Sequence, residues 1–248
     1  MSQVGGVSPS GWPGAVLALV LLVGTCAMPS ASATTYLAVK FGDTIVVGAD
    51  SCSTLTIDHT RHVPGPDVCK IHKCAPHTYF VYAGTLINIT AGIKFDQIAT
   101  RACNQGGTPS QVMDRIRNRL VAAARKAYAK DKQVLVVSVT VFGTSKKGAF
   151  LLSRSARVNQ DGVYEDPIDD CLEGCDNKYI MGGYQEVMKR EISIPGFWDR
   201  NGLGGGVRAL LSEQISADTT HEIAFPLSII EVSKKGELWI EKGACLPK

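Results

Sequence analysis

Two short β-rich segments near residue 40 limit what this chain can fold into more than any other feature. Residues 34–41 (TTYLAVKF) and 44–49 (TIVVGA) have the composition of strands, and Gly42-Asp43 between them is a tight-turn pair. A two-residue hairpin returns the end of the second strand to the start of the first. The pattern therefore predicts that Asp50, which follows the second strand, lies close to Thr34.

A second hairpin is predicted from residues 68–72 (VCKIH) and 79–83 (YFVYA), and it ends in Ala83-Gly84-Thr85. Lys70 is a cation on a strand in an apolar neighbourhood. A charged group in such surroundings requires a partner of opposite charge. We therefore expect a carboxylate beside Lys70.

The rest of the chain predicts an α+β domain. Residues 109–130 form an amphipathic pattern that Thr108 or Ser110 can cap, and residues 134–142 are rich in β-branched side chains. The other predicted elements are a strand over 149–153, a helix over 203–217, and a closing hairpin of 227–232 and 237–240. No repeat or low-complexity linker divides them. This order predicts one domain over residues 34–248, with two stacked antiparallel sheets flanked by helices.

Residues 1–33 contain no Asp, Glu, Lys or Arg. Within them, residues 15–23 form an apolar run that is too short to cross a bilayer, which takes about 20 residues. Ala31-Ser32-Ala33 offers the small residues that a signal peptidase reads. We interpret residues 1–33 as a secretory signal, which predicts a secreted or endomembrane-lumen protein without stable membrane insertion. The alternative is a propeptide without an export role, which is compatible with the cytoplasm and nucleus.

Both interpretations place the cut after Ala33, so the mature chain begins with Thr34. A threonine hydroxyl is a weak nucleophile until a base removes its proton. An N-terminal threonine carries such a base on the same residue, because the α-amine has a reference pKa of about 8. The predicted processing therefore makes Thr34 a candidate nucleophile.

Four short motifs carry a resemblance to a known family. Thr34-Thr35, Gly48-Ala49-Asp50-Ser51, Lys70-Ile71-His72 and Ala83-Gly84-Thr85 occur in the order, and nearly the spacing, of proteasome β subunits. Asp50 follows Thr34 by sixteen residues and Gly84 follows Lys70 by fourteen, as in that family, while the segment from Asp50 to Lys70 is about four residues longer. The resemblance covers most of residues 34–248. It implies the four-layer αββα fold of N-terminal nucleophile (Ntn) hydrolases.

The resemblance also implies roles for single residues. Thr34 would be the nucleophile, Lys70 would lower the cost of forming its alkoxide, and Asp50 would hold Lys70 charged and oriented. The backbone N–H of Gly84 would stabilise the tetrahedral oxyanion. The alternative for Asp50 and Lys70 is a buried ion pair that only ties the two hairpins together.

The chain departs from the family pattern at three places. Cys52 stands where the family normally has arginine, and Gly183 stands where a helper serine belongs. In Asp218-Thr219-Thr220-His221 the catalytic aspartate is kept but a second helper serine is replaced. Two functions therefore stay open: a threonine-type endopeptidase or amide hydrolase, and a catalytically silent β-type subunit with a structural or binding role. A generic Ntn amidase acting on a small molecule is a third option.

The register of the resemblance also predicts the substrate pocket. Tyr82 at its floor would leave the pocket shallow, which favours small side chains in the substrate. The predicted lining is Ser53, Val68, His72, Tyr82 and Leu86.

Partners and cofactors follow from similar arguments. The net charge of +3 is too small and too evenly distributed to predict nucleic acid binding. We expect a peptide or protein substrate and a homo- or hetero-oligomeric ring of β-type subunits, although an exported subunit could not join a cytosolic ring. We expect no cofactor and no metal, since the spacing of the candidate ligands matches no common zinc site. Those candidates are His59, His62, Cys69, His72 and Cys74.

Three further features are interpreted as structural. The glycines at 202 and 204–206 predict a flexible loop rather than a phosphate site. Seven cysteines follow residue 33, an odd number that cannot all pair within one chain, and Cys171 and Cys175 can bridge in an oxidising compartment. The glycosylation sequon at Asn88 falls beside the predicted cleft, so we expect it to be unmodified.

Overall fold

The computed structural model describes residues 34–57, 61–85, 87–88, 91–172, 174–220 and 222–245. The leader predicted for residues 1–33 lies outside them. The first hairpin is confirmed: β1 (Thr35–Phe41) and β2 (Thr44–Asp50) pair antiparallel across a turn at Gly42-Asp43. Because Tyr36 pairs with Ala49, the register brings Asp50 to the level of Thr35.

The first sheet has five antiparallel strands in the order β13-β1-β2-β14-β15. The predicted closing hairpin forms β14 (Leu227–Ser233) and β15 (Gly236–Glu241). The sequence pattern did not locate β13 (Asn177–Gly183), which pairs with the whole of β1. Strand β13 therefore covers the edge of β1 from Phe41 to Thr35.

The second sheet is also antiparallel, with the main order β11-β10-β9-β6-β5 and with β12 paired to β10. The predicted strands at 79–83, 134–142 and 149–153 are confirmed, and the last extends further than expected. The bounds of these strands are β5 Ile71–Ala75, β6 Thr78–Gly84, β9 Leu135–Ser145, β10 Gly148–Asn159, β11 Gly162–Glu165 and β12 Asp169–Cys171.

One predicted boundary is wrong. The strand expected at 68–72 begins only at Ile71, so Lys70 precedes β5 and does not lie within it. The reason is that the preceding segment bonds to the loop after β2: the N–H of Val68 donates to the carbonyl of Ser51 at 2.8 Å, and the N–H of Gly65 donates to that of Ser53 at 2.6 Å. Lys70 is thus carried on a connection between the two sheets.

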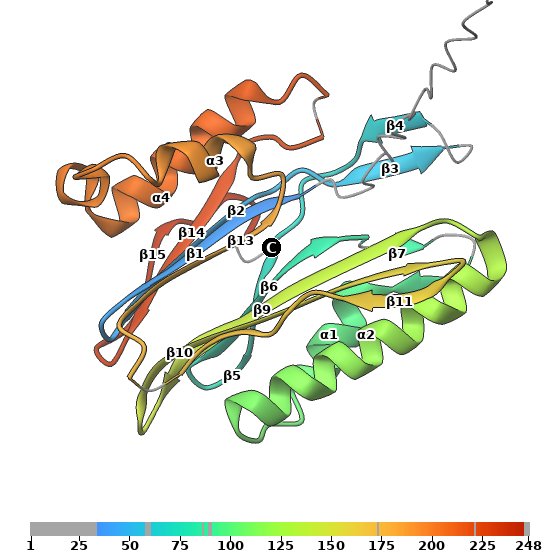
Figure 1. The fold of residues 1–248 in the computed structure, drawn as a ribbon, viewed down its shortest axis with the longest axis horizontal. Coiled ribbons are helices and arrows are strands. Elements are labelled where there is room, and N and C mark those ends of the chain that lie inside the picture. The colour runs from blue at the N-terminus through green and yellow to red at the C-terminus, as the bar shows by residue number, and fades with distance from the viewer. Residues whose placement is uncertain are drawn as a thin grey trace, which may run out of the picture.

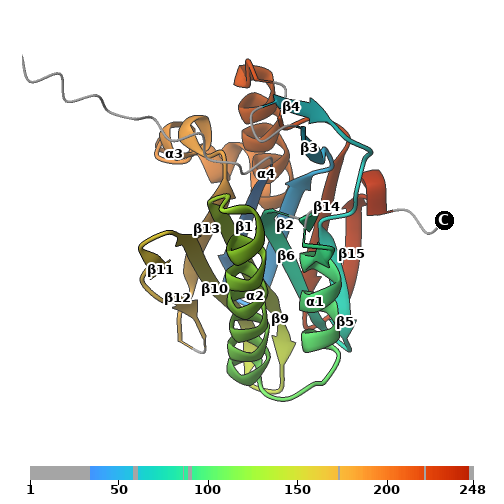
Figure 2. The ribbon, with the colours of Figure 1, turned by 90° about the vertical axis from the view of Figure 1, so that its right-hand side faces the viewer.

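Helices cover the outer face of each sheet (Figures 1 and 2). Helices α1 (Phe95–Cys103) and α2 (Pro109–Asp131) pack on the six-stranded sheet, and α3 (Glu186–Glu191) and α4 (Phe197–Ala217) pack on the five-stranded sheet. Thr108 caps α2 as predicted, in a reciprocal capping box with Gln111. None of the helices in the described part of the chain is long and apolar enough to span a membrane.

Three buried hydrophobic clusters fill the spaces between these layers. One fills the space between α1, α2 and the six-stranded sheet, a second lies between the two sheets, and a third lies between the five-stranded sheet and α3 and α4. The chain is therefore a mixed α and β structure of two antiparallel sheets flanked by helices, as the sequence predicted. Smaller elements complete it: β3 Thr54–Ile57, β4 Arg61–Pro64, β7 Ile87–Asn88, β8 Ile93–Lys94 and the 3₁₀ helix η1 Gly243–Cys245.

The flexible loop predicted for the glycines after residue 201 is wrong, because these residues lie inside α4. Gly202 has a φ of +63° and marks a kink in the helix. A Cβ at Gly204 would lie 2.6 Å from Ile240 of β15, and one at Gly206 would lie 2.7 Å from Trp198. Gly204 therefore lets the helix approach β15 closely, and Gly206 leaves room for the Trp198 ring from the start of the same helix.

Three disulfides account for six of the seven cysteines after residue 33. Cys69 pairs with Cys245, Cys74 with Cys103, and Cys171 with Cys175, as predicted for the last pair. Cys52 is the free, buried cysteine. The first disulfide links η1 to the residue before Lys70, and the N–H of Ala244 in η1 donates to Ser51 Oγ at 3.4 Å. The C-terminal segment is thus attached on both sides of the Asp50–Lys70 region.

We expect the Cys69–Cys245 bridge to contribute more stability than Cys171–Cys175. It closes a separation of 176 residues against 4, and the chain-entropy model then gives about 5 against roughly 2 kcal/mol. Urea unfolding of Cys69→Ser/Cys245→Ser and Cys171→Ser/Cys175→Ser measures the difference. Equal losses in the two double variants would contradict this ranking.

Candidate active site

The Asp50 carboxylate lies at the end of β2, beside the start of β1. The backbone N–H of Thr35 donates to Asp50 Oδ1 at 2.8 Å, and the N–H of Cys52 donates to Oδ2 at 3.1 Å. The first bond follows from the hairpin register, which sets residue 50 opposite residue 35, and the second is a local bond within the turn that follows β2. The predicted proximity of Asp50 to the Thr34-Thr35 end is confirmed.

Lys70 binds the same carboxylate from the segment that leads into the other sheet. Its Nζ donates to Oδ1 at 2.8 Å and to Oδ2 at 2.9 Å, and both side chains are fully buried. The N–H of Tyr82 in β6 donates to the carbonyl of Lys70 at 3.3 Å, which ties Lys70 to the six-stranded sheet. The ion pair therefore joins the two sheets at the end where β1 begins.

Burial shifts the pKa of both groups in this pair. Desolvation raises the pKa of the Asp50 carboxyl and lowers the pKa of the Lys70 ammonium, and in each case the charge of the partner opposes the shift. Lys70 therefore releases a proton more readily than an exposed lysine. A lysine with a lowered pKa is suited to exchange a proton with a neighbouring hydroxyl.

Gly84 is the last residue of β6, two residues beyond the Tyr82 that binds the Lys70 carbonyl. Its φ is +108°, and a Cβ there would lie 2.1 Å from the carbonyl oxygen of Val136. A side chain at this position would collide with β9. Gly84 is therefore at the same end of the six-stranded sheet as Lys70, in a conformation that only glycine adopts without strain.

Residues 183 and 184 contact the start of β1 from its other side. The N–H of Tyr184 donates to the carbonyl of Thr34 at 3.2 Å, and Thr35 Oγ1 donates to the carbonyl of Tyr184 at 2.6 Å. A Cβ on Gly183, whose φ is +76°, would lie only 1.6 Å from the Thr34 carbonyl oxygen. The backbone here approaches Thr34 too closely for the helper serine that the family pattern has at this position.

Asp218 orders the loop that follows α4. Its Oδ2 accepts the N–H of Glu222 at 2.8 Å and of Ile223 at 3.0 Å, and its Oδ1 accepts the N–H of Thr220 at 2.8 Å. Burial works against ionisation of Asp218, but the hydrogen bonds outweigh it and hold the pKa of this carboxyl below its ordinary value. The loop reaches Tyr184 through Glu222, whose Oε2 accepts the tyrosine hydroxyl at 2.6 Å.

Cys52 stands next to the ion pair as an inert thiol. It is 3% exposed, and its N–H, not its side chain, contacts Asp50. Burial, and then the charge of Asp50, raise the pKa of the thiol. Cys52 therefore supplies no positive charge in place of the arginine of the family pattern.

The predicted pocket residues separate into two groups. Ser53 and Val68 lie beside the ion pair, on the segments that the Ser51–Val68 hydrogen bond joins. The side chains of Tyr82 and His72 have other contacts: the Tyr82 hydroxyl donates to the Thr85 carbonyl at 2.7 Å, and the His72 ring stacks on Phe80. Phe80 and Tyr82 belong to the cluster under α1 and α2. Leu86 lies outside the described residues.

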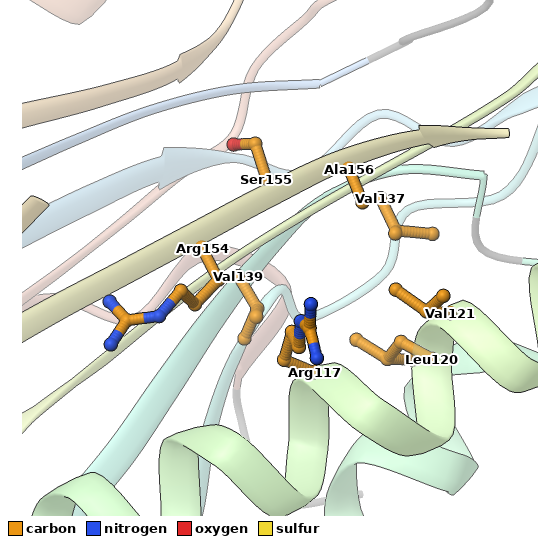
Figure 3. Close-up of a pocket in the computed structure, with 8 residues that line it drawn as sticks. All are labelled: Arg117, Leu120, Val121, Val137, Val139, Arg154, Ser155 and Ala156. Atoms are coloured by element: carbon orange, nitrogen blue, oxygen red, sulfur yellow. The ribbon is translucent and has the colours of Figure 1, made fainter. Parts of the chain in front are cut away.

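A small hollow elsewhere does not belong to this site. It lies between α2 and strands β9 and β10 (Figure 3), and its volume is about 10 Å³. That volume accommodates no more than about one water molecule. None of the predicted site residues lines it.

The candidate zinc ligands do not form a cluster in the described part of the chain. Cys69 and Cys74 are both in disulfides and so are not available as thiolates. His59 lies outside the described residues, as does the side chain of His62. Asn88 is buried, and its amide donates to Asp131 Oδ2 at 2.5 Å, which is consistent with the expectation that it is unmodified.

Sequence reasoning missed three residues of this site: Thr35, Tyr184 and Glu222. Thr35 belongs to the Thr34-Thr35 motif, but the motif predicts no role for its hydroxyl. Neither Tyr184 nor Glu222 has a predicted role: the pairing of β13 with β1 brings Tyr184 here, and the loop ordered by Asp218 brings Glu222. Neither a protein-family model nor a curated protein matches the chain.

The Asp50–Lys70 pair allows a test that separates structure from chemistry. In a protein that begins at residue 34, Asp50→Asn or Lys70→Met alone leaves one buried charge uncompensated, which costs about 3–5 kcal/mol. We expect the double variant to regain most of that stability in urea unfolding. We also expect all three variants to lose at least tenfold in the rate at which an electrophile modifies the Thr34 hydroxyl.

The alternative role of the pair makes the opposite prediction for the double variant. If the pair only ties the hairpins together, the stable double variant will be modified at the wild-type rate. That result would remove Asp50 and Lys70 from the chemistry.

Proposed function

We propose that the mature protein is a threonine-type hydrolase of peptide or amide bonds, with Thr34 as the nucleophile. The observation that carries this proposal is the buried Asp50–Lys70 pair, whose carboxylate also binds the N–H of Thr35. It links a proton-exchanging ammonium to the first peptide of the predicted mature chain. The chemistry requires only these protein groups and water.

The proposed reaction has two halves. Thr34 Oγ attacks the substrate carbonyl and transfers its proton to the α-amine, while the Lys70 ammonium stabilises the developing alkoxide and the N–H of Gly84 stabilises the tetrahedral oxyanion. The C–N bond then breaks, the leaving amine takes a proton, and an ester on Thr34 remains. Water attacks this ester by the same route, releases the acid and restores the hydroxyl.

The two sheets with helices on both outer faces support the proposal that the chain has the four-layer αββα fold of Ntn hydrolases. The four motifs add support for a proteasome β-subunit type, and with it for assembly into a ring. Three disulfides and the leader favour an oxidising compartment, so the secretory interpretation of residues 1–33 is the one we propose.

A silent β-type subunit is the second candidate, and one observation favours it. The helper serine position at Gly183 is closed by the Thr34 carbonyl, so no side chain there can order the amine. In this case the fold would serve only assembly or binding.

Capture of Thr34 distinguishes the two functions. We expect mass spectrometry to find a mature chain that begins at Thr34, and a small peptide β-lactone to add its mass to that residue. Thr34→Ser should keep part of the labelling, while Thr34→Ala should abolish it. Thr56→Ala, in β3, is the matched control and should label normally. Correctly processed protein without any adduct would favour the silent subunit.

Restoring the family residue at position 183 should not improve the enzyme. Gly183→Ser places a Cβ against the Thr34 carbonyl and requires a positive φ from a residue other than glycine. We expect a lower thermal midpoint and a slower labelling rate, compared with Gly92→Ser at an exposed turn that also has a positive φ but open space. Faster labelling in Gly183→Ser would contradict this prediction, because it would show that the site accommodates a serine at position 183.

A further inference from the structure

The first two residues of the mature chain depend on Tyr184 for their position. Tyr184 uses its backbone N–H to bind the carbonyl of Thr34 and its backbone carbonyl to accept the hydroxyl of Thr35. Thr34 and Thr35 are both buried. A displacement of Tyr184 would therefore be transmitted directly to the residue that carries the proposed nucleophile.

The side chain of Tyr184 is itself fixed by Glu222. Its hydroxyl donates to Glu222 Oε2 at 2.6 Å, a short bond to a charged acceptor. Such bonds are roughly twice as strong as those between neutral groups. Burial, followed by Glu222, raises the pKa of Tyr184, so the phenol keeps the proton that this bond needs.

Glu222 in turn belongs to an ordered loop. The Asp218 carboxylate, at the C-terminal cap of α4, accepts the backbone N–H groups of Thr220, Glu222 and Ile223. The contacts therefore run without a gap from the end of α4 through Glu222 and Tyr184 to Thr34 and Thr35.

We propose that Tyr184 and Glu222 are positioning residues for Thr34, and that their hydrogen bond replaces the ordering that helper serines would supply. This inference rests on the proposed function. Its physical basis is that Gly183 leaves no room for a side chain near Thr34. The position of residue 34 must then be set from the backbone of residue 184, and the Tyr184–Glu222 bond holds that backbone in place.

Labelling kinetics of the full mature protein with a small peptide β-lactone test this role. Tyr184→Phe removes the donor, and we expect the maximal labelling rate at saturating reagent to fall by roughly ten- to hundredfold. The concentration that gives half of that rate should stay within about twofold, because neither side chain is expected to bind the reagent. The matched control is Tyr179→Phe, an exposed tyrosine on β13, the strand that ends directly before Tyr184, and this variant should label like the wild type.

Variants of Glu222 provide an independent test of the same hydrogen bond. Glu222→Gln keeps an oxygen acceptor for the phenol, so it should retain much more of the labelling rate than Glu222→Ala. Glu213→Gln, exposed on α4, is its control. The double variant Tyr184→Phe/Glu222→Ala should be no slower than the slower single variant, because both remove the same bond.

The outcomes separate this inference from the proposed function. Wild-type labelling with a slow Tyr184→Phe supports both, and wild-type labelling with an equally fast Tyr184→Phe overturns the positioning role alone. An unlabelled wild type overturns both. If Tyr184→Phe is unfolded at the assay temperature, the comparison of Glu222→Gln with Glu222→Ala decides the question, and equal rates there overturn the inference.

Discussion

The buried ion pair between Asp50 and Lys70 is the interaction on which the rest of the site depends. The two charged side chains are not exposed to water. Buried charges of this kind are tolerated only when they pair with each other and form further hydrogen bonds. Asp50 meets this condition through Lys70, Thr35 and Cys52. Because Asp50 belongs to one sheet and Lys70 leads into the other, this requirement fixes how the sheets meet at the end where β1 begins.

Contacts on both sides of the ion pair also hold it in place. Cys69, directly before Lys70, is bonded to Cys245, and Ser51, directly after Asp50, accepts a hydrogen bond from the neighbouring Ala244. Further between the sheets, the Tyr36 hydroxyl contacts Thr140 Oγ1 at 2.9 Å. The tyrosine ring lies where a Cβ on Gly182 would be, 2.0 Å from the nearest ring atom. Small residues in β13 thus let polar contacts form across the inter-sheet core, and the end of β1 is held from both sides.

Local sequence patterns predicted the elements that depend on local physics. The Gly42-Asp43 turn, the capping box at Thr108 and the closing hairpin all follow from residues that are neighbours in the chain. The hairpin register also predicted that Asp50 meets the Thr34 end. Strand β13 was missed because its apolar run is only three residues long, between Asn177-Lys178 and two glycines, and its partner β1 is more than 130 residues away. The glycines of α4 were misjudged because helix propensity is a weak signal where a helix packs closely on β15. Tyr184 and Glu222 could not be found for the same reason as β13, since their roles arise only from long-range pairing.

The energetics of buried charge favour a chemical role for the pair over a structural one. Replacing a buried ion pair by well-packed apolar side chains is often neutral or stabilising, so two hairpins could be joined equally well by leucine and valine. Burial instead raises the pKa of Asp50 and lowers that of Lys70, which weakens the charged state of both. A pair of this kind is costly as an attachment but useful as a source and acceptor of protons. Its carboxylate is bound to the N–H of Thr35, the residue directly after the proposed nucleophile Thr34.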